Sequence, residues 1–149
     1  MAFSGPGGGV MNRRTLVRAL VPLVLMGVIF FFSAQPAGGH HAWWVIVVRK
    51  LGHITGYALL TAAWWWALRQ VVQRPLIWAV GISLVYACSD ELHQTFVRGR
   101  EGTPRDVVID AIGMGIAAML IWVRQSTPTG WGQTDARGEA PKSSLGQSP

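Results

Sequence analysis

The chain has 149 residues, of which 50% are hydrophobic, 13% are charged and eight are tryptophan. This composition is typical of a membrane protein and argues against a soluble domain, which needs more polar surface to cover a core of this size. The formal net charge is +6, but the basic residues are scattered at segment ends, so the sequence does not predict nucleic-acid binding. The single cysteine, Cys88, excludes an internal disulfide and a CxxC motif, and we expect it to be a small buried packing residue.

The first segments predict a tail and a membrane helix. Residues 1–12 are rich in glycine and hold too few large apolar groups to become ordered, so they predict a flexible N-terminal tail. The apolar run at residues 16–32 predicts the first membrane helix. A cleaved secretory signal is the alternative, because paired arginines precede the run, as in twin-arginine signals, and Ser33-Ala34 follows it. We favour retention of the helix, since its apolar run is longer than the ~7 to 15 residues of a signal core.

The second membrane helix is predicted at residues 51–68, after a turn-rich connection and an interfacial segment that begins with two tryptophans. Lys50, His53 and Tyr57 recur at spacings of three and four residues, which places them on one face of this helix. Each has an ordinary structural interpretation, as a snorkelling lysine, a hydrogen-bonded histidine and an amphipathic tyrosine. Their alignment instead favours a shared functional role.

The third membrane helix is predicted at residues 76–94, and its apolar run ends in a polar cluster. The polar residues at its end and in the following loop are Asp90, Glu91, His93, Gln94, Arg98 and Arg100. Ionisable groups in a membrane helix turn to the bundle interior or to a cavity, because lipid exposure would cost each of them several kcal/mol. This cluster is therefore predicted to be a functional site. The alternative is a polar cap where the helix meets water.

The fourth membrane helix is predicted at residues 107–123, after a helix start with Thr103 as N-cap, a proline at the first position and an acid at the third. Asp106 and Asp110 are four residues apart on its first turns, and Gly113 continues their face with a small residue that allows close helix contact. Asp106 could act only as a cap, whereas Asp110 lies one turn deeper. Residues 125–149 lack apolar periodicity and predict a disordered C-terminal tail.

The sequence thus predicts an all-α polytopic membrane protein, with a bundle of four transmembrane helices in a domain at residues 13–124. An even number of helices puts both termini on one side of the cell membrane, and the positive-inside rule makes that side the cytoplasm. At the opposite boundary, acids and bases from three helix ends converge, where they can pair and lower the cost of their desolvation. We expect them to form an outward-facing pocket for a ligand that carries phosphate, carboxylate or hydroxyl groups, with arginines as bidentate contacts.

Three motifs occur in order along these helices. They are K-x-x-H-x-x-x-Y from Lys50 to Tyr57, S-x-E-x-x-Q-x-x-x-x-x-R from Ser89 to Arg100, and an acidic pair followed by Gly113. Together, over residues 20–124, they resemble the VanZ-like family of small bacterial membrane proteins. The chain departs from that family's pattern at Asp110, where the family has asparagine, and no aspartate directly precedes Lys50. The resemblance implies a multi-pass protein of the cell envelope, and the family's named member is associated with low-level teicoplanin resistance.

Two functions fit these residues best. The first is a binding protein that holds the head group of a cell-envelope lipid or glycan and modulates glycopeptide susceptibility. Its candidate ligand-binding residues are Lys50, His53, Tyr57, Asp90, Glu91, His93, Gln94, Arg98, Arg100, Asp106 and Asp110. The second is a membrane-embedded hydrolase or transferase acting on a phosphate-containing lipid, with Glu91 or Asp90 as general base and His53 or His93 as acid or metal ligand.

The sequence ranks binding above catalysis because it contains no HExxH or GxSxG motif. A transporter or channel is a third hypothesis, which would require an oligomer to enclose a path. Membrane lipids are the expected partners, and neither a cofactor nor a metal is predicted. Whether the protein is an enzyme, and its oligomeric state, stay open at this point.

Overall fold

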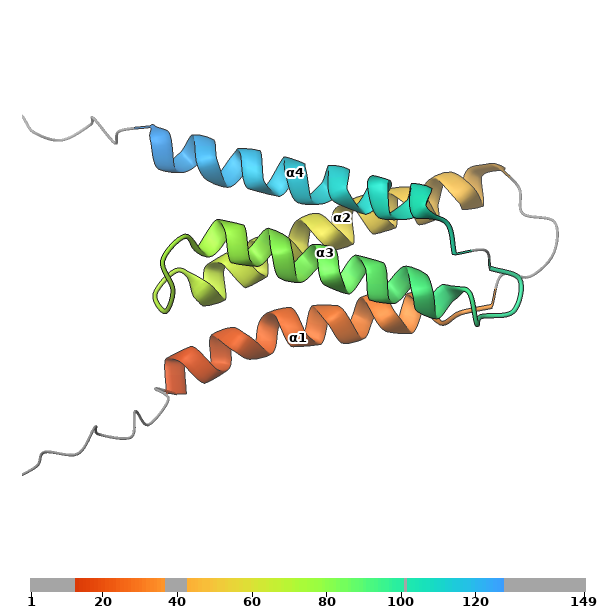
Figure 1. The fold of residues 1–149 in the computed structure, drawn as a ribbon, viewed down its shortest axis with the longest axis horizontal. Coiled ribbons are helices and arrows are strands. Elements are labelled where there is room, and N and C mark those ends of the chain that lie inside the picture. The colour runs from red at the N-terminus through yellow and green to blue at the C-terminus, as the bar shows by residue number, and fades with distance from the viewer. Residues whose placement is uncertain (1–12, 37–42, 101, 128–149) are drawn as a thin grey trace, which may run out of the picture.

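The computed structural model describes residues 13–36, 43–100 and 102–127, and this part of the chain is all-helical (Figure 1). The helices are α1 (Arg13–Ser33), α2 (Trp43–Leu68), α3 (Pro75–Gln94) and α4 (Pro104–Ser126). The four predicted helices are therefore confirmed. The N-terminal tail and almost all of the C-terminal tail lie outside the described residues, so their disorder stays a prediction.

Three of the helices are long and apolar enough to cross a membrane. These candidate spans are Leu16–Ser33, Pro75–Gln94 and Pro104–Ser126. α2 is not among them, because Arg49, Lys50 and His53, together with its aromatic residues, lower its mean hydropathy. Its polar residues fit its place in the fold, since α2 contacts each of the other three helices. That α2 also crosses the membrane stays a prediction.

The start of α2 differs from the sequence-based prediction. The helix begins at Trp43, whereas residues 43–48 were expected to form a separate interfacial segment. No glycine or proline lies between Trp43 and Arg49, so no helix-breaking residue interrupts the helix over this stretch. Trp43 and Trp44 are 77% and 56% exposed, which suits tryptophans at the level of lipid head groups.

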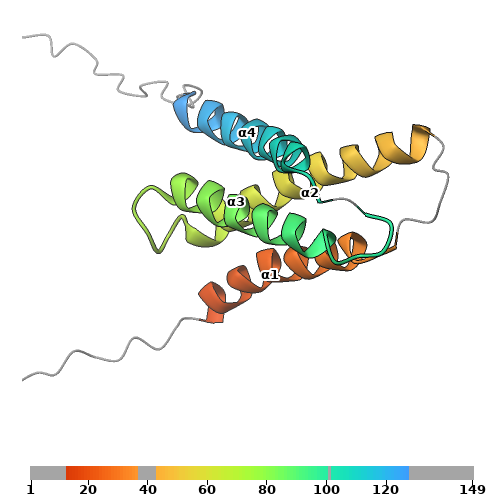
Figure 2. The same cartoon turned by 45° about the vertical axis from the view of Figure 1, so that its right-hand side comes forward.

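The bundle has two distinct ends (Figures 1 and 2). α1 and α3 finish, and α2 and α4 start, at the right-hand end of Figure 1, and the same grouping holds in the rotated view of Figure 2. We call this the polar end, because the buried acids described below lie there. At the opposite end, the guanidinium of Arg18 lies 5.2 Å from the ring centroid of Trp66, and that of Arg69 lies 5.5 Å from the centroid of Trp65. Aromatic and basic side chains therefore lie together at this end.

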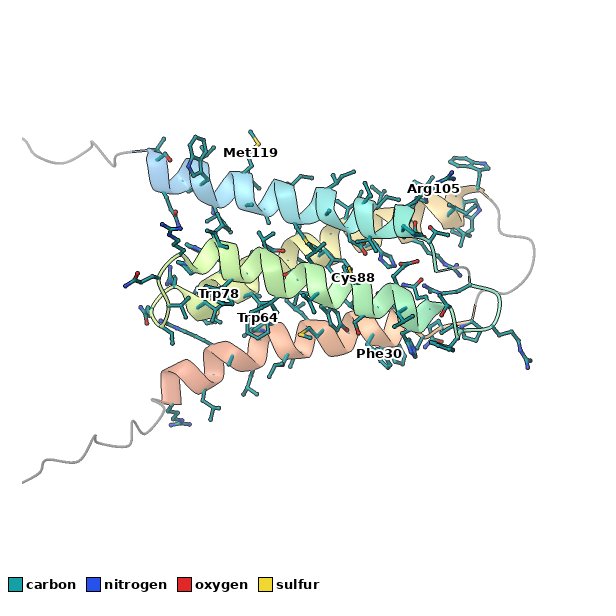
Figure 3. All side chains as sticks on the ribbon, in the orientation of Figure 1. Phe30, Trp64, Trp78, Cys88, Arg105 and Met119 are labelled. Atoms are coloured by element: carbon teal, nitrogen blue, oxygen red, sulfur yellow. The ribbon has the colours of Figure 1, made fainter. Side chains whose placement is uncertain are left out.

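The core lies along α2. Tyr57, Leu60, Ala87 and Met114 form a buried cluster from α2, α3 and α4. Outward-facing positions carry large apolar side chains, such as Trp78 and Met119, which Figure 3 labels on α3 and α4. Such a surface suits contact with lipid rather than water.

Cys88 departs from its predicted role. It is exposed, whereas we expected a buried packing residue. The neighbouring Ala87 is fully buried. Because successive helical residues are about 100° apart around the axis, the face that buries Ala87 turns Cys88 outward.

Candidate functional site

Asp90 joins three helices at the polar end. Its side chain is 1% exposed, and Oδ2 accepts hydrogen bonds from Ser33 Oγ at 2.7 Å, Gln94 Nε2 at 3.2 Å and Tyr57 Oη at 3.4 Å. Gln94 reaches it because residues four apart are neighbours on a helix. Ser33 ends α1 and Tyr57 lies on α2, so one carboxylate oxygen ties both helices to α3.

His53 and Asp110 pair across α2 and α4. His53 Nδ1 lies 3.0 Å from Asp110 Oδ1, and the two side chains are 21% and 1% exposed. Gly113 allows this approach, because a Cβ at that position would collide with the backbone carbonyl of Ile54. The predicted close contact of α4 through Gly113 is thus confirmed. The contact brings the aspartate within reach of a histidine one residue before Ile54.

Glu91 joins α3 to the start of α4. Its Oε1 accepts a hydrogen bond from the backbone N–H of Thr103, which is the N-cap residue of α4. The carboxylate therefore satisfies a backbone donor that the helix start leaves free, and it lies near the positive end of the helix dipole. The predicted helix start at Thr103 and Pro104 is confirmed, although the Thr103 hydroxyl accepts no backbone N–H of the first turn and instead donates to Asp106 Oδ2 at 3.2 Å.

Arg100 fastens the α3–α4 connection to the end of α1. Its guanidinium donates to the carbonyls of Phe32 and Gln35, at 2.9 and 3.0 Å, and to Gln94 Oε1 at 3.0 Å. Gly99, with a φ of 75°, turns the chain so that Arg100 points back toward α1. Burial lowers the pKa of the Arg100 guanidinium from its ordinary value, and the positive charge of Arg49 lowers that pKa further.

The bonds of Arg100 give it a structural role at the polar end. Three of its five N–H donors are used within the protein, on carbonyl and amide oxygens. The bidentate contact that we expected it to offer a ligand stays a prediction. Arg100 acts as a C-terminal cap of α1, where carbonyls lack helical partners.

The three buried acids share one property. Asp90 Oδ1, Glu91 Oε2 and Asp110 Oδ2 are buried and have no hydrogen-bond partner in the part of the chain that the structure describes. In each case the other oxygen of the same carboxyl group is bonded. The polar end is therefore rich in buried acceptors. Within the described ranges, no group of three or more His, Cys, Asp or Glu residues could hold a metal ion.

Comparison of the sequence with known protein families gives a match. The model of the VanZ/LLP1 family matches residues 18–125, which run from early α1 to late α4. The chain belongs to the VanZ/LLP1 family. The comparison with curated proteins finds no match, and neither does the comparison with solved structures. Together, the VanZ-like match and the candidate spans make the chain a multi-pass membrane protein.

The three VanZ-like motifs meet in space. The first supplies His53 and Tyr57, the second supplies Glu91, Gln94 and Arg100, and the third supplies Asp110 and Gly113. The departure at Asp110 keeps the geometry, because an asparagine side chain also has an oxygen that can face His53 Nδ1. Asp90, which lies between two motif positions, forms the centre of the hydrogen bonds.

Four of the candidate residues lie outside this network of buried groups. Lys50 and Arg98 are exposed, and Asp106 is half-buried and accepts a hydrogen bond from the Thr103 hydroxyl. The ring of His93 lies tilted against that of Phe30, with ring centroids 4.5 Å apart. Phe30 lies on α1 toward the polar end in Figure 3. His93 follows Asp90 by three positions but turns to the α1 flank. The network is therefore smaller than the sequence-based set, whose role in binding stays a prediction.

Sequence reasoning missed two members of the site. Ser33 was considered only as part of a cleavage site, although it is 2% exposed and bonded to Asp90. The second missed member is the backbone N–H of Thr103, which no residue type in the sequence could reveal. For Ser33 a signal existed, because it is a polar residue that ends an apolar helix at the same boundary as Asp90.

Proposed function

We propose that this VanZ-like membrane protein works at the bacterial cell envelope and binds the hydroxyl-bearing head group of an envelope lipid or glycan at its polar end. In this proposal the polar end faces outward, both termini lie in the cytoplasm, and head-group binding modulates glycopeptide susceptibility. The observation that carries the proposal is the set of three buried carboxyl groups, each of which has one bonded oxygen and one oxygen without a protein partner in the described chain.

These oxygens favour one class of ligand. A buried acceptor that stays unpaired costs about 1–3 kcal/mol, so three of them favour a ligand that brings donors. Sugar hydroxyls donate and accept hydrogen bonds, and several lie on one ring. A phosphate group brings only acceptors and negative charge, which three acids would repel. The proposal therefore narrows the sequence-based expectation from any polar head group to one with hydroxyls.

The test uses purified protein in phosphatidylcholine nanodiscs with and without glucosyl diacylglycerol as the probe. We expect the glycolipid to raise Tm in the wild-type protein, because a ligand that binds only the folded state stabilises it. Asp90→Asn and Glu91→Gln should reduce this rise. Asp106→Asn is the matched control, since that acid lies near the site but outside the buried network, and it should keep the rise. A Tm that does not respond to the glycolipid would contradict the proposal.

A second function has one observation in its favour. His53 is held by Asp110 through Nδ1, and no hydrogen bond within the described residues involves its Nε2. An oriented imidazole with a free nitrogen can act as a general acid or base, so the polar end could belong to a membrane-embedded hydrolase or transferase with Glu91 as a base. Release of the head group from the glycolipid, measured by mass spectrometry and lost in His53→Gln and Glu91→Gln, would favour the enzyme. Binding without turnover would favour the binding protein.

A further inference from the structure

A hollow of about 250 Å³ lies between α3 and α4 at the polar end. It is lined by the apolar residues Leu92 and Val107, by Cys88, and by the polar residues Glu91, Thr95 and Thr103, and the surface that it presents is almost wholly apolar. We call this hollow the α3–α4 slot. Cys88 and Leu92 are exposed on the outer surface of the bundle, so the slot is reached from the side of the bundle.

The connection before α4 closes one end of the slot. A Cβ at Gly102 would collide with the backbone carbonyl of Glu91 and with the side chain of Thr95. The chain at Gly102 therefore packs directly on the end of α3. This packing leaves the lipid-facing flank, between Leu92 and Val107, as the open side.

Glu91 is the acidic residue that lines the slot. The residue is 6% exposed, and its Oε1 is bonded to the backbone N–H of Thr103. Its Oε2 is buried without a partner among the residues that the structure describes. A hydroxyl can satisfy this oxygen by donating a hydrogen bond to it.

We propose that the α3–α4 slot is a lateral binding site for a neutral glycolipid that enters from the bilayer. A sugar hydroxyl bonds Glu91 Oε2, while the first carbons of the lipid chain lie against Cys88, Leu92 and Val107. This inference rests on the proposed function. It adds the route by which the ligand enters, the residue that recognises the head group and the class of ligand. A water-soluble glycan without an apolar chain would gain nothing from the slot's apolar surface.

The chain offers a direct reporter of slot occupancy. Cys88 is its single cysteine and lines the slot. The full-length protein in phosphatidylcholine nanodiscs is treated with a small methanethiosulfonate reagent, with octyl glucoside or its permethylated analogue as the probe. At a probe concentration about ten times Kd, occupancy should slow the modification of Cys88 about tenfold. The permethylated analogue has the same chain and ring but no donor, so it should not protect the thiol.

Two variants sharpen the test. Glu91→Gln should lose the protection by octyl glucoside, because the amide nitrogen no longer accepts a hydroxyl. The double variant Cys88→Ser, Ser89→Cys moves the thiol to the opposite flank of α3, since Ser89 lines a separate apolar hollow of about 510 Å³ with Met26 of α1. Octyl glucoside should leave the thiol at position 89 unprotected. The comparison of the two probes needs no variant, so it stands even if Glu91→Gln fails to fold.

Each outcome decides the proposal. Protection by octyl glucoside alone, confined to position 88 and dependent on Glu91, supports it. Equal protection by both probes would mean that the slot accepts any apolar chain without reading the head group, which overturns it. If Cys88 is unprotected while glucosyl diacylglycerol still raises Tm through Asp90, the lateral slot is wrong and the proposed function stands. If neither response occurs, both are wrong.

Discussion

His53 on α2 and Asp110 on α4 are joined at 3.0 Å through Nδ1 and Oδ1, directly beside the point where Gly113 packs on the backbone of Ile54. The pair and the glycine thus depend on the same helix contact. In a bilayer, small residues set how closely two helices approach, so the separation of α2 and α4 is decided at Gly113. A substitution of Gly113 should therefore displace the buried acids even though it alters no polar side chain.

Gly113→Ala should destabilise the protein. The added Cβ meets backbone atoms of Ile54, which cannot rotate away as a side chain could, so α2 and α4 must separate. Overpacking of this kind costs about 1–3 kcal/mol. A lower Tm in detergent micelles would record it. Gly115→Ala is the matched control on the same helix, because a Cβ there has no neighbour within 4 Å, and it should leave Tm unchanged or raise it slightly. Equal losses in both variants would refute the close-contact argument.

Asp110→Asn should keep most of the structure, whereas Asp110→Ala should not. An asparagine at this position still presents an oxygen to His53 Nδ1, as the VanZ-like family pattern suggests. Alanine leaves the half-buried imidazole without its partner, and hydrogen bonds to charged groups contribute about 1.5–3 kcal/mol. A double-mutant cycle with His53→Ala, measured by Tm, isolates the pair. Additive effects of Asp110→Ala and His53→Ala would show that the pair has no energetic coupling.

The sequence predicted most of the fold because apolar runs of spanning length and short polar connections leave few alternatives for a chain of this composition. It also predicted that Gly113 would allow close helix contact, since its position on the face of Asp106 and Asp110 follows from helical periodicity alone. The early start of α2 was missed for a physical reason. Trp43 and Trp44 suit the interface whether or not they are helical, so residue type did not reveal the backbone.

The internal arrangement of the site was harder to predict. Periodicity places Asp90 and Gln94 on one face, but it cannot tell which of His93 and His53 meets an acid, because that depends on which helices are neighbours. His93 faces Phe30 of α1, and His53 faces Asp110 of α4. Arg100 donates to the carbonyls of Phe32, near the end of α1, and of Gln35, just beyond it. Backbone acceptors have no signature in a sequence, so this contact could not be inferred from it.

Arg100→Lys should fail to replace Arg100. The guanidinium reaches the carbonyls of Phe32 and Gln35 and the amide oxygen of Gln94 at once, whereas an ammonium on a flexible stem cannot hold three acceptors in this fixed arrangement. Both Arg100→Lys and Arg100→Ala should lower Tm and increase proteolysis between α1 and α2. Deletion of residues 133–149 is the control and should leave Tm unchanged. A deletion that destabilised the protein as much as Arg100→Ala would remove the organising role of the polar end.

α1 should be retained in the mature protein. Ser33 is buried against Asp90, and the carbonyl of Phe32 accepts from Arg100, so the end of α1 is part of the polar end. Cleavage after Ala34 would remove both contacts. A chain with different epitope tags at its two termini should therefore show both tags on one band of full mass. A mature band that carries the C-terminal tag alone would instead show that α1 is a cleaved signal.

The number of crossings tests the role of α2, which is the one helix of the described chain without the hydropathy of a span. If α2 crosses the membrane, a reporter inserted at Gln73 should lie in the cytoplasm, one at Gly102 outside, and one after Trp122 in the cytoplasm again. Alkaline phosphatase should then be active only at Gly102, and green fluorescent protein should fluoresce at the other two positions.

The physical basis is that α2 turns His53 and Tyr57 into the bundle, where they contact Asp110 and Asp90, so lipid meets few of its polar groups. Alkaline phosphatase activity at Gln73 would mean that the chain between α2 and α3 lies outside, and equal exposure of the positions at Gly102 and after Trp122 would contradict the crossing by α4. Alkaline phosphatase activity at Gln73 together with a crossing by α3 would place the polar end on the cytoplasmic side and remove the basis for head-group binding at the outer face.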